Sequence, residues 1–173
     1  GISVYNEGAF ETPLGSIQID KALADKIISG HKRISFHPSI FQDENSIEMQ
    51  LPFIKLVFGD ASIVPVEFGT QFYEDAEILA GSLAAALKGR DDCLVIASSD
   101  MSHYHPYNIA CAIDKHAIDI VTKMKARALY DEAQAGTSEL CGIMPVACLL
   151  LAAEKMGYDK VKALMPKIDF KPK

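Results

Sequence analysis

The chain has 173 residues, of which 49% are hydrophobic and 23% are charged, and it carries a net charge of −6 at pH 7. This length fits one domain, and the apolar share is large enough to bury a core. The acidic balance argues against a nucleic-acid-binding protein, because phosphate binding needs clustered Lys and Arg. The longest apolar stretch, residues 146–153, is shorter than the roughly 20 residues that a membrane span needs.

The four cysteines, Cys93, Cys111, Cys141 and Cys148, contain no CxxC pair. We expect reduced thiols, since disulfides belong to oxidising compartments and follow recognisable spacings. No signal peptide is recognised, so we expect a cytoplasmic protein with neither a membrane nor a nucleic acid as its partner. Residues 1–4 already have the sequence of a strand, so the chain is expected to be a fragment or a shortened form.

Local signals place the elements of the N-terminal half. Asp20 is a good N-cap, since its carboxylate can accept a backbone N–H from the first turn of the helix that follows. Pro52 is expected to interrupt a later helix, because its ring removes a backbone donor. The predicted elements are a strand over residues 2–5, a turn over 11–15, a helix over 20–28, a helical piece over 44–50 that resumes over 53–58, and a strand over 62–68.

The clearest strand of the C-terminal half is residues 93–97, a continuous apolar run typical of a central strand that helices cover on both faces. Helices are predicted over residues 72–87, 106–124, 126–133 and 145–156, the last opened by Pro145. Strands alternate with helices, so the sequence predicts an α/β protein with a mixed, mostly parallel sheet flanked by helices. No repeat or linker interrupts residues 1–173, which are expected to form a single domain.

A polar loop follows the predicted central strand. It carries Ser98, Ser99, Asp100 and His103, at the end of a strand where open α/β sheets bind their ligands. Histidine titrates near neutral pH, and Asp100 can orient it or bind a metal, so the pair is a candidate general acid and base. The alternative is that these residues only cap the strand and start the next helix, and the pattern favours neither interpretation.

Cys141 stands just before a predicted helix N-terminus. The helix dipole favours a thiolate there, so Cys141 is a candidate metal ligand or reactive thiol. A small buried residue in a tight turn explains its position as well. The other three cysteines are assigned to packing.

Two carboxylates form a third candidate cluster. Glu44 and Glu48 are four residues apart and share one face of a predicted helix. Such a pair can bind a metal or line a pocket, and more often it forms a solvated face.

Four segments, in this order, resemble the Memo family. They are ETPLG at residues 11–15, ENSIEMQLPF at residues 44–53, SSDMSHY at residues 98–104, and Cys141 and Gly142 followed by Pro145. Each segment is short, but four in the right order over most of the chain are specific. The resemblance covers about residues 1–153 and implies the C-terminal part of a Memo-like domain.

Memo proteins resemble the class III extradiol dioxygenases in fold, and those enzymes hold a non-haem ferrous ion and open catechol-type rings with oxygen. The resemblance implies an incomplete fold of that type, with Cys141 in place of the metal-binding glutamate. It also implies that His103 takes the place of the acid–base histidine, with Asp100 as its neighbour. Thiolate plus imidazole would suit iron(II) or copper. The residues then expected to line the pocket are Ser98, Ser99, Glu44 and Glu48.

Two departures from the family pattern bear on these expectations. The family's other two metal-binding histidines lie in an N-terminal segment that this sequence does not contain, and Asn45 stands where the family has a histidine. The first hypothesis is a dioxygenase-like, metal-dependent oxidoreductase with an unknown substrate and an incomplete ligand set. The second is a non-catalytic module that binds a small anion or a peptide, because human-type Memo proteins are associated with phosphotyrosine peptides. The third is a truncated, inactive paralogue.

Overall fold

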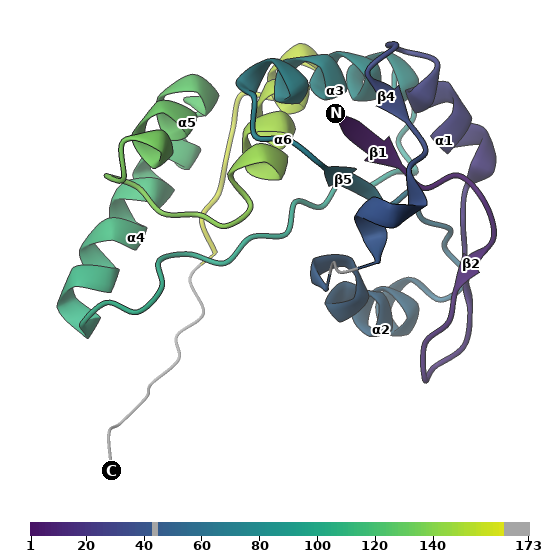
Figure 1. The fold of residues 1–173 in the computed structure, drawn as a ribbon, viewed down its shortest axis with the longest axis horizontal. Coiled ribbons are helices and arrows are strands. Elements are labelled where there is room, and N and C mark those ends of the chain that lie inside the picture. The colour runs from purple at the N-terminus through teal and green to yellow at the C-terminus, as the bar shows by residue number, and fades with distance from the viewer. Residues whose placement is uncertain (43–44, 165–173) are drawn as a thin grey trace.

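A computed structural model describes residues 1–42 and 45–164, and in these ranges it contains six α-helices, one 3-10 helix and five short strands (Figure 1). In chain order they are β1 (Ile2–Val4), β2 (Ala9–Phe10), β3 (Ile17–Gln18), α1 (Lys21–Ile28), β4 (Ile34–Ser35), η1 (Pro38–Phe41), α2 (Ser46–Phe58), β5 (Val66–Phe68), α3 (Tyr73–Ala86), α4 (Tyr107–Thr122), α5 (Ala126–Gln134) and α6 (Ile143–Lys155). Within the same ranges no helix has both the length and the hydrophobicity that crossing a membrane requires.

The main sheet has three strands in the order β4-β1-β5. β1 pairs in parallel with β4, where Ile2 lies opposite Ile34, and antiparallel with β5, where Ile2 lies opposite Phe68. β2 and β3 form a separate antiparallel hairpin around the predicted turn at residues 11–15. The predicted α/β class is confirmed, but the sheet is smaller than expected and only one of its two pairings is parallel.

The prediction of a central strand over residues 93–97 is wrong. These residues belong to an irregular segment that has no sheet partner in the described part of the chain, and Leu94 and Ile96 are exposed. An apolar run becomes a strand only where a neighbouring strand supplies backbone hydrogen bonds. The predicted strand over residues 62–68 is also shortened to β5, preceded by a single parallel bridge between Ile19 and Ile63.

The helices follow the predictions more closely. Asp20 caps α1 as expected, since its carboxylate accepts the backbone N–H of Leu23 at 2.9 Å. The predicted interruption at Pro52 is wrong, because α2 runs unbroken through it. Proline removes one backbone hydrogen bond, but the other turns of a 13-residue helix remain bonded. The predicted position Glu44 lies outside the described residues.

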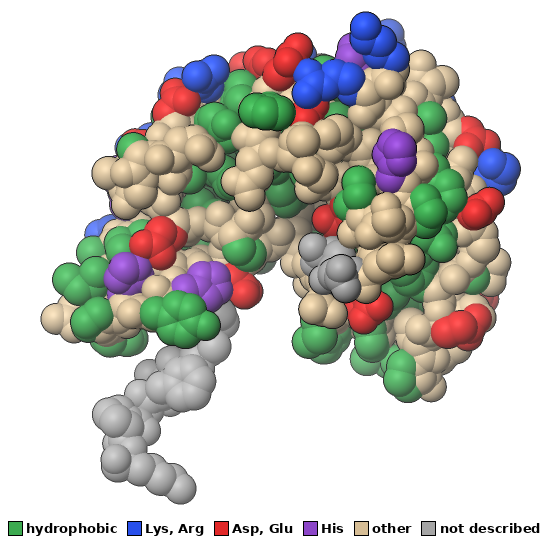
Figure 2. All heavy atoms as spheres, viewed as in Figure 1, with side chains coloured by type: hydrophobic (Ala, Val, Ile, Leu, Met, Phe, Trp, Pro, Cys, Tyr) green, Lys and Arg blue, Asp and Glu red, His purple; other side chains and the backbone are tan. Residues whose placement is uncertain are grey.

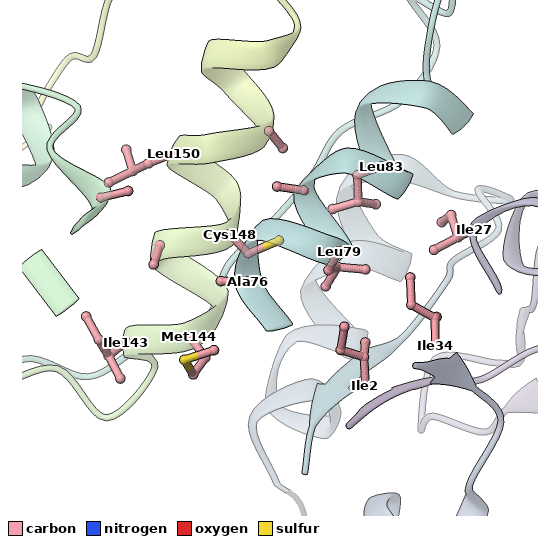
Figure 3. Packing of buried hydrophobic residues seen from close by; sticks show 14 of the residues in the cluster. Ile2, Ile27, Ile34, Ala76, Leu79, Leu83, Ile143, Met144, Cys148 and Leu150 are labelled. Carbon is pink, nitrogen blue, oxygen red and sulfur yellow. The ribbon is translucent and has the colours of Figure 1, made fainter. Parts of the chain in front are cut away.

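The core lies around α3, which contacts α6 on one side and α1 on the other (Figures 1 and 3). Ala76 and Ala80 of α3 and Ala147 of α6 are fully buried. Their short side chains allow the two helices to pack closely. On the sheet side, Leu79 belongs to the same buried cluster as Ile2 of β1.

A buried ion pair ties the sheet to α3. The side chain of Asp75, at the start of α3, is 0% exposed, and its Oδ1 lies 2.6 Å from Nη2 of Arg33, the residue before β4. The same guanidinium donates from Nη1 to Oε2 of the exposed Glu74 at 2.7 Å. One arginine thus contacts two neighbouring carboxylates that differ in their burial, and the buried one also accepts a hydrogen bond from the Thr70 hydroxyl.

We predict that Asp75→Ala lowers the free energy of unfolding by about 3 kcal/mol, because it leaves the partly buried Arg33 charge without its buried partner. The matched control is Glu74→Ala, which removes an exposed partner of the same arginine and is expected to cost less than about 1 kcal/mol. Urea unfolding followed by circular dichroism measures both. Equal losses of stability in the two variants would contradict the role of burial.

Candidate active site

The loop over residues 98–105 lies against the turn that carries Cys141. The backbone N–H of Asp100 donates to Sγ of Cys141 at 3.0 Å, and the N–H of Cys141 donates to the carbonyl oxygen of Asp100 at 3.3 Å. The Ser99 hydroxyl lies 3.9 Å from the same sulfur and accepts the N–H of Gly142 at 3.0 Å. The fold therefore brings together a cysteine and a polar loop that are about forty residues apart in the sequence.

Gly142 makes this close approach sterically feasible. A Cβ at this position would lie 2.2 Å from the carbonyl oxygen of Ser98 and 2.7 Å from Cβ of Ser99. Gly142 is also the N-cap of α6, so Cys141 immediately precedes the helix, as the sequence predicted. The sulfur therefore lies beside a helix N-terminus and accepts one backbone N–H.

His103 and Cys141 line the same cavity of about 240 Å³. The imidazole Nε2 lies 3.5 Å from Oδ2 of Asp100, so the carboxylate can orient the ring. The thiol and the imidazole that the sequence proposed as partners therefore face one space. Other residues that line this cavity are Gln71, Ala133, Gln134, Gly136, Ser138, Glu139, Leu140 and Ile143.

Glu139 is a site residue that the sequence analysis missed. Its Oε1 accepts a hydrogen bond from Nε2 of His105 at 2.7 Å, and its Oε2 accepts the backbone N–H of His103 at 3.4 Å. The hydrogen bond from His105 holds the pKa of Glu139 below its ordinary value, although partial burial acts in the opposite direction. The sequence offered one signal for this role, because Glu139 is a carboxylate two residues before the candidate cysteine Cys141.

The remaining predicted pocket residues lie elsewhere. Ser98 lines a second and larger cavity of about 1080 Å³, and its hydroxyl accepts a hydrogen bond from Nε2 of Gln50 in α2 at 3.4 Å. Glu48 is exposed on α2 and lines neither cavity. Glu44 lies outside the described residues, so the predicted carboxylate pair has only one described member.

The cysteines divide by exposure. Cys148 is buried in the core as predicted, and burial raises the pKa of its thiol to about 12. Cys93 and Cys111 are exposed, so their assignment to packing is wrong. Cys93 lies in the irregular segment that was predicted to be a buried strand, and Cys111 lies on an exposed part of α4.

The donor set of the cavity does not make a complete metal centre. Cys141, His103 and Glu139 are the donor-type side chains that line it, and Glu139 is engaged by His105. Across residues 1–42 and 45–164, no three His, Cys, Asp or Glu side chains are arranged to hold a metal ion. A catalytic site of this kind generally needs three protein ligands.

The fold and the pocket thus define an α/β protein with a thiol and an imidazole in one cavity. Residues 1–168 match the family model described as Memo-like protein. The chain belongs to this family, which confirms the resemblance found in its motifs.

Three relatives are described as MEMO1 family proteins. The chain is 37% identical to that of Pyrobaculum aerophilum over 165 residues, which cover 94% of the chain and 58% of the relative. It is 36% identical to that of Methanothermobacter thermautotrophicus over 166 residues, covering 95% and 60%. It is 34% identical to that of Saccharolobus solfataricus over 159 residues, covering 90% and 56%. The chain therefore spans less than two thirds of the length of these relatives.

We predict that Gly142→Ala lowers the free energy of unfolding by about 1–3 kcal/mol, because the added methyl group overlaps the backbone of the loop. It should also shift the amide resonance of Asp100, which donates to Cys141. Urea unfolding and NMR measure the two effects.

Gly81→Ala is the matched control for this change. Gly81 lies inside α3 with no atom within 4 Å of the added Cβ, so the exchange should stabilise the helix by about 0.5–1 kcal/mol. An unchanged Asp100 amide in Gly142→Ala would contradict the proposed contact between the loop and the turn.

We predict that His105→Ala raises the pKa of Glu139 toward the ordinary carboxyl value of 4.5, because it removes the hydrogen bond that lowers it. The folded-state pKa is below the unfolded one, so this pair stabilises the protein above the unfolded pKa. That contribution is lost as the pH falls through the folded pKa.

Carbon NMR titration of the glutamate carboxyl groups measures the change. His116→Ala is the control, because His116 pairs with Glu132 and not with Glu139. A pKa of Glu139 that stays depressed in His105→Ala would mean that another group lowers it.

Proposed function

We propose that this Memo-family chain contributes to a dioxygenase-like redox pocket, in which Cys141 is a metal ligand and His103 is the acid–base group. The observation that carries the proposal is that both side chains line one cavity while the sulfur accepts a backbone N–H. A thiolate is a donor type that iron(II) and copper accept. Because the described residues do not complete a metal centre, further ligands would have to come from outside them.

In this proposal each residue has a separate task. The N–H of Asp100 holds the sulfur of Cys141 beside the N-terminus of α6, where it can bind a metal. The carboxylate of Asp100, 3.5 Å from the His103 ring, holds the imidazole so that it can give or take a proton in the cavity. Glu139 holds the loop through His105 and the backbone of His103.

Metal analysis tests the ligand role. The purified protein is titrated with iron(II) without oxygen, or with copper, and the bound metal is measured at equilibrium. Because the described ligand set is incomplete, we expect the wild type to bind metal weakly and Cys141→Ala to bind it at least about tenfold more weakly. Cys111→Ala is the matched control, because it removes an exposed cysteine from α4 and should retain the metal of the wild type.

His103→Gln separates the two roles. It should keep more metal than Cys141→Ala and lose oxygen uptake with catechol-type compounds, because it removes the proton-transfer group. Equal metal binding by the wild type and Cys141→Ala would contradict the proposal.

We propose as the second candidate the other hypothesis raised by the sequence, a non-catalytic pocket that binds a small anion or a peptide. A peptide titration separates the two candidates. Calorimetric titration of metal-free protein with a phosphotyrosine peptide should give binding that survives chelator if this candidate is right. A protein that retains no metal and binds no peptide would match an inactive paralogue.

A further inference from the structure

An apolar segment of the chain lies outside any sheet. Residues 93–97 have the composition of a buried strand, yet Leu94 is 68% and Ile96 53% exposed. None of the five residues takes part in a backbone–backbone hydrogen bond with another residue of the described chain. Exposed apolar side chains beside unpaired backbone groups are the features of a strand that lacks its neighbour.

A cavity of about 1080 Å³ separates this segment from the sheet. β5, the outer strand of the sheet, forms one wall, and residues 92–98 form another. The cavity is lined mainly by apolar side chains, including Leu51 of α2, Leu83 of α3 and Met144 of α6. The space therefore has strand-forming backbone on two sides and helices around it, which is the environment of a central strand.

The face of α2 that points away from the cavity is also apolar and exposed to solvent. Met49, Phe53, Leu56 and Val57 follow one another at helical spacing and are all exposed, while Leu51 is the only fully buried side chain of the helix. Figure 2 shows hydrophobic side chains gathered on the surface around α2, beside the notch that divides this part of the molecule from α4 and α5. A helix that is apolar on both faces belongs inside a folded protein.

The relatives contain polypeptide that this chain does not match. The alignment to the Pyrobaculum aerophilum protein covers 58% of that protein, so about two fifths of its length lies outside the match. The edge strands that a second copy of this chain offers, β4 and β5, have two and three residues, so they are shorter than the five-residue segment that they would pair with.

We infer that the cavity between β5 and residues 92–98 is a docking site for an apolar β-strand from the part of the family sequence that this chain does not match. The strand pairs with residues 93–97 and turns them into a strand. The rest of that polypeptide covers the outer face of α2. Because helices lie on both sides, the incoming strand is a continuous apolar run of about five residues, some 16 Å long.

Cys141 and Gly142 also line this cavity, but the inference rests on the exposed apolar side chains and the unpaired backbone of residues 93–97, and its test involves no metal. The 173-residue chain is co-expressed with the unmatched part of the Pyrobaculum aerophilum relative. Light scattering after size exclusion gives the stoichiometry, and hydrogen–deuterium exchange reports each backbone amide. We expect a one-to-one complex in which the amides of residues 93–97 exchange at least about tenfold more slowly than in the free chain.

Leu94→Asp is the diagnostic variant. The side chain is exposed in the free chain, so the change should leave its circular dichroism and stability unaltered, yet it should abolish the complex. Leu14→Asp is the matched control, because Leu14 is 52% exposed on the β2–β3 hairpin and does not line the cavity.

Three outcomes would overturn the inference. They are a failure of the chain and the segment to copurify, a complex that leaves residues 93–97 unprotected, and binding of Leu94→Asp that equals binding of the control. Protection of residues 93–97 in a dimer of the chain alone would assign the cavity to a second copy instead.

Discussion

The packing of α6 on α3 is the interaction on which the rest of the structure depends. Ala76 and Ala80 meet the buried face of α6, and α3 in turn contacts α1 and the sheet. Because Ile143 and Met144 are buried in the first turn of α6, this contact also sets the position of the helix N-terminus. Cys141 stands two residues before that turn, so the core determines where the thiol lies.

The pocket is organised mainly by backbone groups. The sulfur of Cys141 accepts the N–H of Asp100, and Gly142 allows the two segments to approach to a distance that a side chain would prevent. Backbone donors keep their place whatever the rotamers nearby, so the thiol has a defined environment although it is exposed. Among the side chains, His103 lines the same cavity as the thiol.

The two cavities meet at the turn that carries Cys141. Cys141 and Gln71 line both cavities, whereas His103 lines only the smaller one and residues 93–97 line only the larger one. Neither cavity is lined by four of the exposed apolar side chains of α2, those of Met49, Phe53, Leu56 and Val57. The thiol is therefore the group that links the polar loop to the apolar part of the molecule.

The sequence by itself determined the features that depend on near neighbours. Asp20 caps α1, Cys141 precedes a helix, and the order of the motifs indicates the family, because capping, helical periodicity and motif spacing are local properties. Only the tertiary structure decided that residues 93–97 are not a strand and that Glu139 holds His105. A strand needs a partner, and an ion pair needs two segments brought together across 34 residues, so neither can be read from local pattern.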